Sequence, residues 1–410
     1  MCDVQEEMIP KPKNNRSLKE GFCYKCKTEK PDLHVRNSDF CKSCFIDSTI
    51  HRFRNNLMKI QKGNVLLALS GGPSSMCLLD LMSNFNSVDP VNKRQPKYPN
   101  VHVCHVDVSL AVPQIETDIV DKLKADVERR NFAFSSVKVQ ELFGNSTTVI
   151  AKDDKTILLD VSEDASPESR LIKSLDSVSS LSSREDLLNI YIKKSIINQA
   201  IAKDCNIILF GDNSTLLAIK TIALSAKGRG VVLADEIALE HIITPGDKNI
   251  SVVKPLRDIL GKEVAFYNQF KDLKPFNNAN LTTGLKKDCS IDRMTSDFII
   301  GLDEEFPSTV STITRTAFKI KAKEHSNLAC SLCDAPLDEV SKFAEIMGEE
   351  VKKQTWKDGE LPINHVLCYA CRNISRDLKK TLEKKSLSGS LPGFVSRAAM
   401  KEQIQDYLIE

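Results

Sequence analysis

The chain has 410 residues and a formal net charge of +2, and 27% of its residues are charged. This balance excludes a chain that is basic throughout, so any surface for nucleic acid must be local. No apolar run approaches the length that spans a membrane, and the N-terminus has no apolar core of signal-peptide length. We therefore expect a cytoplasmic protein of two or three domains.

The chain divides into three parts by composition. Residues 1–50 are polar and contain paired cysteines, as in a zinc-ribbon module. Residues 51–320 alternate short apolar runs with helical patterns, and residues 321–410 contain paired cysteines again, followed by a basic helical tail. We expect these parts to be three domains, with the two cysteine-containing modules at the ends.

Cysteine spacing is the strongest signal in the sequence. Eight of the 13 cysteines form four Cys-x-x-Cys pairs. In a cytosolic chain such pairs indicate metal binding rather than disulfides. We predict two zinc sites, the first with ribbon-like spacing and the second with a wider gap that contains Trp356 and His365. Free reduced thiols, or sites shared with a partner, are the alternatives. The predicted ligands are Cys23, Cys26, Cys41 and Cys44 in the first set, and Cys330, Cys333, Cys368 and Cys371 in the second.

The middle part has the rhythm of an α/β fold with a doubly wound parallel sheet. One helix is predicted to begin near Pro73 or Ser74, and the next has Ile119, Leu123 and Val127 on one face. Two further helices are predicted over residues 185–203 and 216–223. Two stretches interrupt the pattern: a polar loop at 84–100 and a Ser-rich, acidic segment at 162–183, which we expect to be a mobile insertion. The predicted strands are 65–69, 101–108, 137–139 and 207–210.

A glycine-containing loop follows the first of these strands. The stretch "NVLLALSGGPSSMCLLDLM" places an apolar run before Ser-Gly-Gly and an amphipathic segment after it. Glycines let the backbone turn sharply, and the next helix points free N–H groups and its positive end at an anion. The bland alternative is an ordinary strand-to-helix turn, because Pro73 donates no N–H but suits the first turn of a helix. The candidate nucleotide-binding residues of this loop are Ser70, Gly71, Gly72, Ser74 and Ser75.

Several motifs together resemble the ATP-pyrophosphatase, or PP-loop, superfamily, whose loop reads Ser-Gly-Gly-x-Asp-Ser. Within it, the chain is similar to the family of second subunits of cytoplasmic tRNA 2-thiolation complexes. The segments that carry the resemblance extend from Cys23 to Ile374, and they include "CYKCKTEKPDLHVRNSDFCKSCF", "LALSGGPSSMCLLDLM", "LFGDNSTLLAIKTIALSAKGRG", "KPLRDILGKEVAFYNQF", "EFPSTVSTI", "CSLCDAPL" and "LCYACRNI". The resemblance implies a PP-loop domain, of the adenine nucleotide alpha hydrolase-like fold, between two four-cysteine zinc modules.

The departures from the family pattern concern the residues that do chemistry. Active members carry an Asp where Ser74 lies. Their Gly-His-Asn-x-Asp-Asp motif falls on residues 211–216, where Gly211 and Asn213 match, but Thr215 and Leu216 replace the two Asp residues. Magnesium needs oxygen ligands, usually carboxylate and phosphate, and leucine supplies none. The resemblance therefore implies a degenerate nucleotide site, in which ATP binding by this chain is doubtful.

The same motif departs from the family pattern at three further positions. Asp212 stands in the place of the His, and Ile219 and Lys220 replace the Glu-Thr that follows in active members. We therefore expect no catalytic residues in this motif.

Active thiolases of this group also use paired cysteines within the nucleotide domain. Between Cys104 and Cys330 this chain has only Cys205 and Cys289, which are not paired. Cys205 is expected to be a small buried apolar residue. A single thiol cannot hold an iron–sulfur cluster, so a chemical role for Cys289 stays a minor alternative.

Local basic stretches are the candidate RNA surfaces. Residues 11–62 contain 13 Lys and Arg against 5 Asp and Glu, with aromatic residues among them. Such a surface can neutralise phosphates, although a solubilising face is the bland alternative. The segment "AKGRG" is read as a flexible basic turn that could meet a phosphate. The RNA-binding candidates are Lys25, Lys27, Lys42, Lys227 and Arg229.

The resemblance implies a function in 2-thiolation of the wobble uridine of cytosolic tRNA Lys, Glu and Gln. The chain would be the non-catalytic, tRNA-positioning subunit of a heterodimer with a catalytic PP-loop subunit. Sulfur would come from a thiocarboxylated ubiquitin-related carrier. The alternatives are an autonomous ATP-dependent tRNA sulfurtransferase and a zinc-ribbon scaffold without an RNA role.

Overall fold

The computed structural model describes residues 21–87, 96–115, 118–144, 148–151, 156–160, 166–245, 248–276, 279–286, 288–306, 308–321, 329–337, 360–362, 367–377 and 390–391. The chain forms two compact units, Met1–His51 and Arg52–Glu410. Trp356 and His365, within the predicted gap of the second cysteine set, lie outside the described residues.

The first unit is built around a short hairpin. Strands β1 (Leu33–Val35) and β2 (Ser38–Phe40) pair antiparallel, and the first turns of helix α1 (Lys42–Met58) follow. The two residues of the hairpin turn, Arg36 and Asn37, both have positive φ, at 51° and 58°. Two positive φ values in succession give the turn the twist of a type I′ hairpin. This hairpin fixes the distance between the two cysteine pairs of the unit.

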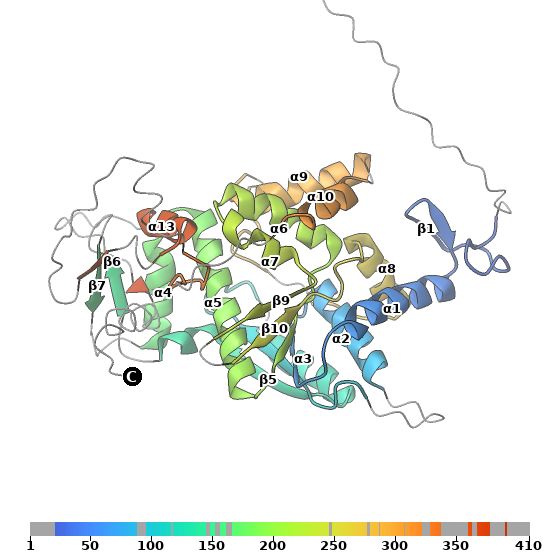
Figure 1. The fold of residues 1–410 in the computed structure, drawn as a ribbon, viewed down its shortest axis with the longest axis horizontal. Coiled ribbons are helices and arrows are strands. Elements are labelled where there is room, and N and C mark those ends of the chain that lie inside the picture. Colours follow the sequence, from blue (N-terminus) through green and yellow to red (C-terminus); the bar gives the residue numbers. More distant parts are fainter. Residues whose placement is uncertain are drawn as a thin grey trace, which may run out of the picture. The chain divides into compact units, whose positions relative to one another are not determined.

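The second unit is an α/β domain with a six-stranded, mostly parallel sheet (Figure 1). The strand order is β5-β4-β3-β8-β10-β9, and only the edge strand β9 runs antiparallel to its neighbour. The chain moves from β3 to β4 in one direction and later returns to place β8 on the other side of β3. The carboxyl ends of β3 and β8 therefore form a topological switch point, where open α/β sheets bind ligands. The strands are β3 (Val65–Ala68), β4 (Val101–Asp107), β5 (Ala133–Lys138), β8 (Ile207–Leu209), β9 (Glu240–Ile243) and β10 (Ile250–Val253).

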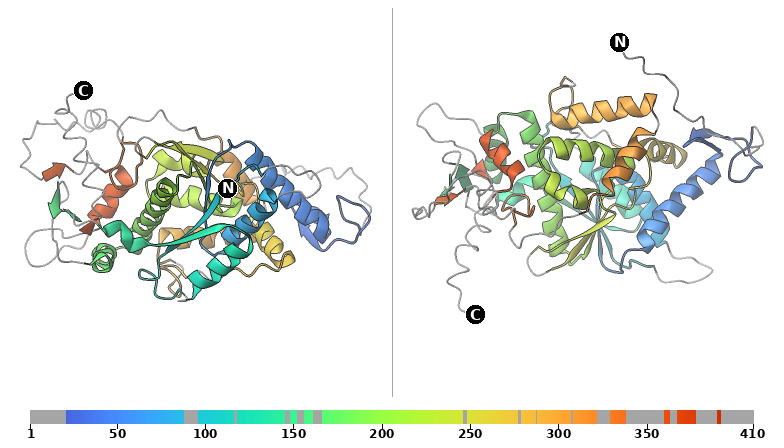
Figure 2. Two further views of the ribbon diagram at one scale, coloured as in Figure 1. Left: turned by 90° about the horizontal axis from the view of Figure 1, so that it is seen from below. Right: turned by 45° about the horizontal axis from the view of Figure 1, so that its top comes forward.

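Helices cover both faces of this sheet. Figures 1 and 2 show α5 (Leu181–Ala202) on one side, and α2 (Pro73–Asn86) and α3 (Ile119–Arg129) on the other. All four residues of β3 are buried, as expected of a central parallel strand. Leu66 and Ala68 pack with Ile196 and Ala200 of α5. This face of the sheet and α5 thus share one cluster of buried apolar residues.

The remaining elements connect and extend the sheet. Several of them are short, and all belong to the second unit. They are α2 (Pro73–Asn86), α3 (Ile119–Arg129), η1 (Val139–Phe143), α4 (Pro167–Ser177), α5 (Leu181–Ala202), α6 (Ser214–Ala226), η2 (Gly230–Val232), α7 (Leu233–Ile237), α8 (Gly261–Phe270), α9 (Ile291–Glu305), α10 (Thr309–Ala317) and α13 (Tyr369–Arg376).

The predicted α/β architecture is confirmed, with local corrections. The third strand is β5 at Ala133–Lys138, several residues before the predicted position, and Val139 begins the 3-10 helix η1. The Ser-rich segment is also different from its prediction: α4 occupies Pro167–Ser177, with Ser166 as its N-cap and Leu171 and Leu175 buried. Serine side chains favour helix caps, so a serine-rich composition does not exclude helices. Helix α2 likewise continues to Asn86, into the segment predicted to be a loop.

The described part of residues 321–410 packs into the second unit. Cys330, Leu332, Cys371 and Ile374 share a core cluster with Tyr191 of α5. A small antiparallel sheet of order β11-β7-β6-β12 also combines two strands from the middle part of the chain with two strands from residues 321–410. Its strands are β6 (Thr148–Ala151), β7 (Thr156–Asp160), β11 (Glu360–Pro362) and β12 (Ser390–Leu391). The second cysteine set is therefore part of the core of the α/β domain.

None of the described helices has both the length and the apolar content to cross a membrane.

Candidate functional site

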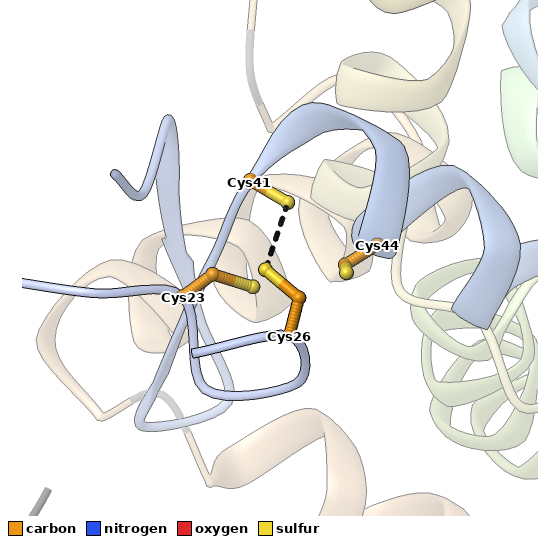
Figure 3. Close-up of side chains that lie close together, drawn as sticks. All are labelled: Cys23, Cys26, Cys41 and Cys44. Atoms are coloured by element: carbon orange, nitrogen blue, oxygen red, sulfur yellow. Dashed lines mark hydrogen bonds between the residues drawn. The ribbon is translucent and has the colours of Figure 1, made fainter. Parts of the chain in front are cut away.

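The first cysteine set lies in the N-terminal unit and combines a tight turn with a helix start (Figure 3). Cys23 and Cys26 belong to a turn in which the Lys27 amide donates to the Cys23 carbonyl at 2.9 Å. Lys27 has a φ of 60°, which closes the turn. Cys41 directly precedes α1, and Cys44 lies in its first turn. The free N–H groups at this helix end favour thiolates.

The four sulfur atoms of this set are placed to share one metal ion. They all lie within 4.8 Å of one another, and the Cys26 and Cys41 sulfurs are 3.9 Å apart. Zinc–sulfur bonds of about 2.3 Å in a tetrahedron place the sulfurs about 3.8 Å apart. A hydrogen bond from the Thr28 side chain lowers the pKa of Cys26 to about 6, whereas burial raises the pKa of Cys44 to about 12. Four thiolates here need the charge of a cation.

The second cysteine set repeats this construction with residues from the other end of the chain. The Asp334 amide donates to the Cys330 carbonyl at 2.9 Å, and Asp334 has a φ of 59°. Cys368 is the N-cap of α13, and Cys371 lies in its first turn. The four sulfurs again lie within 4.8 Å of one another, with the Cys333 and Cys368 sulfurs 3.6 Å apart. Each set can therefore hold one tetrahedral ion.

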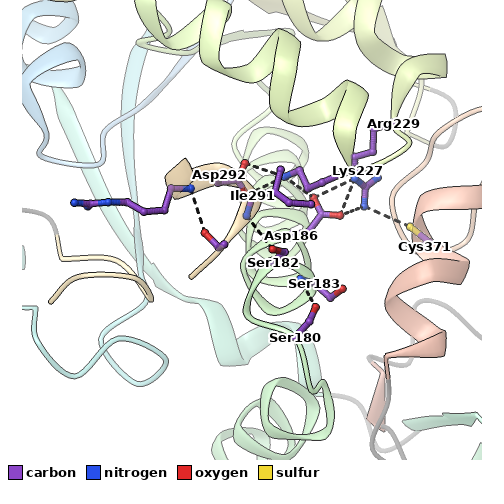
Figure 4. A network of polar contacts seen from close by, with 11 residues as sticks. Ser180, Ser182, Ser183, Asp186, Lys227, Arg229, Ile291, Asp292 and Cys371 are labelled. Carbon is purple, nitrogen blue, oxygen red and sulfur yellow. Dashed lines mark hydrogen bonds and ion pairs between the residues drawn. The ribbon is translucent and has the colours of Figure 1, made fainter. Parts of the chain in front are cut away.

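A network of buried charges adjoins the second set (Figure 4). The Arg229 guanidinium donates to the Asp186 carboxylate at 2.6 and 2.8 Å and to the Cys371 sulfur at 3.7 Å. Lys227 forms ion pairs with Asp186 at 3.3 Å and with Asp292 at 2.9 Å. The side chains of Lys227 and Arg229 are only 8% and 7% exposed.

These contacts correct the interpretation of "AKGRG" as an open basic turn. Lys227 and Arg229 are buried partners of carboxylates, so neither presents its charge to a phosphate at the surface. Gly228 has a positive φ of 75°, and the cations on either side of it point into the domain. The other RNA-binding candidates, Lys25, Lys27 and Lys42, are exposed on the N-terminal unit.

The loop after β3 places Gly71 and Gly72 just before α2, and side-chain hydroxyls of the same loop occupy the amides of both glycines. Gly71, with a φ of 87°, donates its N–H to the Ser75 hydroxyl at 3.0 Å. The Gly72 N–H donates to the Ser70 hydroxyl at 3.3 Å. Ser75 in turn donates to the Gly72 carbonyl at 3.0 Å. The N–H groups that would face an anion are therefore partly satisfied within the loop.

The loop after β8 meets this loop at the switch point. The Asn213 side-chain amide donates to the Ser74 hydroxyl at 2.8 Å, and its oxygen caps α6 at the Leu216 amide. A Cβ atom on Gly211 would lie 3.1 Å from the Ser74 backbone, so the two loops approach as closely as glycine allows. The structure thus brings together all the candidate nucleotide-binding residues of the sequence.

The positions that depart from the family motif have structural contacts here. Asp212 pairs with Lys220 at 2.7 Å, so two replaced positions neutralise each other. The Thr215 hydroxyl accepts the Gly261 amide at 2.9 Å. Leu216 is 38% exposed and offers no ligand. No carboxylate occupies positions 74, 215 and 216, where the family motif would place its metal ligands.

One buried cation near the switch point was absent from the sequence predictions. Lys254 directly follows β10, is 1% exposed, and donates to the Asp235 carbonyl at 3.3 Å. Burial lowers its pKa to about 8. The sequence signal that could have identified Lys254 is its position at the carboxyl end of a strand of the parallel sheet.

Of the two unpaired cysteines that carry a prediction, Cys205 is confirmed as a buried apolar residue, and the role of Cys289 stays a prediction. Cys205 is buried in the core cluster between α5 and the sheet, as expected of a small apolar residue. Cys289 is partly exposed, and among the described residues it belongs to neither four-cysteine group. Asp186 and Asp292 were missed, because no sequence pattern links them to the turn that they bind.

Comparisons with known proteins place this geometry in context. The model of the family described as cytoplasmic tRNA 2-thiolation protein 2 matches residues 290–373. A protein of that name from Danio rerio is 25% identical over 515 residues, covering 100% of this chain and 99% of its own length. One from Drosophila yakuba is 29% identical over 385 residues, covering 88% of this chain and 91% of its own.

A solved structure supports the fold. The U34-tRNA thiolase NcsA from Methanococcus maripaludis, determined with its [4Fe-4S] cluster, aligns with a TM-score of 0.54 and 18% identity. The alignment covers 83% of this chain and 100% of that chain. At this identity the likeness concerns the PP-loop fold alone.

Proposed function

We propose that the chain is a member of the cytoplasmic tRNA 2-thiolation protein 2 family, and that it is the non-catalytic, tRNA-positioning subunit of a heterodimeric tRNA thiolase. Its partner is a catalytic PP-loop subunit. The substrates are the cytosolic tRNAs for Lys, Glu and Gln, modified at the 2-position of the wobble uridine. The proposed location is the cytoplasm, in keeping with the names of the relatives.

The observation that carries the proposal is the switch point of the sheet. Serine hydroxyls occupy the Gly71 and Gly72 amides, and Asp212 is neutralised by Lys220. Ser74 stands where active members have a carboxylate. A site arranged in this way lacks the carboxylates that would hold Mg²⁺ beside a bound ATP. The fold is kept while the means of catalysis are lost, which favours a role in positioning.

The chemistry is assigned to the partner. ATP adenylates the uracil C2 oxygen and releases pyrophosphate, and a sulfur donor then displaces AMP from that carbon. The sulfur arrives as a thiocarboxylate on a ubiquitin-related carrier.

The experiment is a thiolation assay with the isolated chain, the isolated partner and the reconstituted pair. We expect 2-thiouridine only from the pair, and no ATP–pyrophosphate exchange by this chain alone. Thiolation by the isolated chain that is lost in Cys289→Ala would contradict the proposal and support an autonomous sulfurtransferase.

We assign one zinc ion to each cysteine set. The close grouping of the sulfurs supports a single ion, because an iron–sulfur cluster holds its cysteines around several iron atoms and so farther apart. The ion would neutralise the thiolates and join segments that are distant in sequence. In the N-terminal unit, which has a small apolar core, metal binding would supply much of the folding free energy.

The N-terminal unit is the proposed tRNA surface. Lys25, Lys27 and Lys42 are exposed there, together with the aromatic rings of Phe22 and Tyr24, which are 42% and 46% exposed. Exposed cations bind phosphates, and exposed rings can stack on unpaired bases.

Charge reversal tests this surface on the reconstituted complex. Each lost phosphate contact should weaken tRNA binding and reduce the salt slope by about one unit. Lys124→Glu, on the exposed face of α3, is the matched control. If Lys25→Glu, Lys27→Glu and Lys42→Glu all bind tRNA like the control over several salt concentrations, the N-terminal unit is not the tRNA surface, and the zinc-ribbon scaffold becomes the better interpretation.

A further inference from the structure

The turn between α6 and η2 is fastened to the helix that carries Cys371. Gly228 has a positive φ, and a Cβ atom there would lie 2.6 Å from the ring of Tyr369, the first residue of α13. Only a glycine lets the turn lie against that ring. The same turn directs Arg229 toward the Cys371 sulfur, at 3.7 Å. Two adjacent residues of the turn therefore contact the start of α13 independently.

Arg229 joins this cysteine to the α/β domain. Its guanidinium holds the Asp186 carboxylate of α5 through three contacts, at 2.6, 2.8 and 3.1 Å. Asp186 also meets Lys227, which pairs with Asp292 in the first turn of α9. The charges alternate in sign from the thiolate to the N-terminus of α9, whose positive end favours Asp292. Each buried charge thus lies between charges of opposite sign.

A four-thiolate zinc site needs such a contact. A divalent ion with four thiolates keeps two negative charges, which are costly to bury without donors around the sulfurs. Groups that hydrogen-bond to metal ligands orient them, and their loss lowers metal affinity 10- to 100-fold. Arg229 is buried and supplies a fixed, permanently charged donor.

The first cysteine set offers a comparison within the same chain. There the Cys41 sulfur lies 3.3 Å from the hydroxyl of Ser43, a neutral group. The two sets share the turn and the helix start but differ in the charge of these neighbours.

We propose that Arg229 is a positioning residue of the C-terminal metal site, and that the Asp186–Arg229 pair controls how firmly this site retains its zinc ion. The inference rests on the zinc assignment of the proposed function. We expect slow release of zinc from the C-terminal site, at a rate that depends on the Asp186–Arg229 ion pair of the α/β domain.

The test measures zinc release from the full-length chain to excess chelator. A Cys41→Ser background leaves the C-terminal site as the source of zinc. Arg229→Met should speed release 10- to 100-fold. Arg229→Lys should speed it less, because lysine keeps the charge but cannot bind the sulfur and both carboxylate oxygens at once. The Co²⁺-loaded protein should show a shifted thiolate-to-metal absorption band in the Arg229→Met variant, which a change in packing alone would not produce.

Arg130→Met is the matched control. Arg130 is 15% exposed and pairs with Asp126 at 2.6 Å, a pair that contains no metal ligand. This variant should lose stability but release zinc at the parent rate.

Three outcomes would overturn the role of Arg229. The first is parent-like release from Arg229→Met, or from Arg229→Lys if the Met variant does not fold. The second is equal acceleration in Arg130→Met. The third is that Arg229→Met, in a protein that keeps Cys41, speeds zinc release from the N-terminal site as much as from the C-terminal site. A parent protein that binds no zinc would overturn the metal assignment itself, which is a different result.

Discussion

Replacing Asp186 by asparagine keeps the shape of the side chain but removes the charge that two buried cations share. Asp186, Arg229 and Lys227 are each less than 10% exposed, so solvent cannot take the place of the carboxylate. Removing one partner of a buried pair costs about 3–5 kcal/mol, because the remaining charge stays buried and unpaired. Asp292, which is 30% exposed, compensates only Lys227.

The expected shift in melting temperature follows from the size of the unit. The second unit runs from Arg52 to Glu410. An unfolding entropy of about 2.1 cal/mol/K per residue gives roughly 0.75 kcal/mol/K for a unit of this length. A loss of 3–5 kcal/mol then lowers the melting temperature by about 4–7 °C. Calorimetry of the full-length, zinc-loaded chain measures this shift for the transition of the second unit.

A double variant separates charge from packing. Asp186→Leu with Arg229→Met removes both members of the pair, so its cost should be clearly smaller than the sum of the single variants. Glu128→Gln, in an exposed pair with Lys124, is the control and should shift the melting temperature by less than about 1 °C. A shift below 1 °C for Asp186→Asn, or simple additivity in the double variant, would refute the reasoning.

Three further predictions concern the metal, the switch point and a buried lysine. Elemental analysis of the purified protein should find about two zinc ions per chain. Cys41→Ser should reduce the zinc content to about one ion and unfold the N-terminal unit. A zinc content below one ion per chain in the parent would contradict the assignment. Gly211→Ala should lower the free energy of unfolding by about 1–3 kcal/mol, because the added Cβ would lie 3.1 Å from the backbone of Ser74. The control Gly301→Ala has no neighbouring atom within 4 Å of its Cβ and should not lower the melting temperature. Equal effects of the two variants in a thermal melt would be inconsistent with the close approach. Burial lowers the pKa of Lys254 to about 8 in the folded state, against 10.5 when unfolded, so the folded state binds fewer protons between these pH values. The stability of the parent should therefore rise with pH over this range relative to Lys254→Met, by at most about 3 kcal/mol. Denaturant midpoints of the two proteins that differ by a constant amount across this range would disprove the prediction.

Local patterns in the sequence determined much of this protein. The apolar run before Ser-Gly-Gly predicted β3, the switch-point loop and the start of α2 at Pro73, because strand burial and turn chemistry depend on neighbouring residues. Ile119, Leu123 and Val127 predicted the buried face of α3 by their helical spacing. The Cys-x-x-Cys pairs predicted two four-sulfur groups, since two cysteines at that spacing share a turn whatever the rest of the fold does.

Tertiary structure alone decided which of the candidate cations are buried. "AKGRG" is basic and contains glycine, and nothing within it distinguishes an exposed turn from a buried one. Arg229 meets a carboxylate 43 residues away and a sulfur 142 residues away, and both partners arrive only when α5 and α13 pack against the turn. In the same way, helix capping and a buried face turned the Ser-rich segment into α4. Burial and ion pairing depend on contacts between distant segments, and local sequence periodicity carries no record of those contacts.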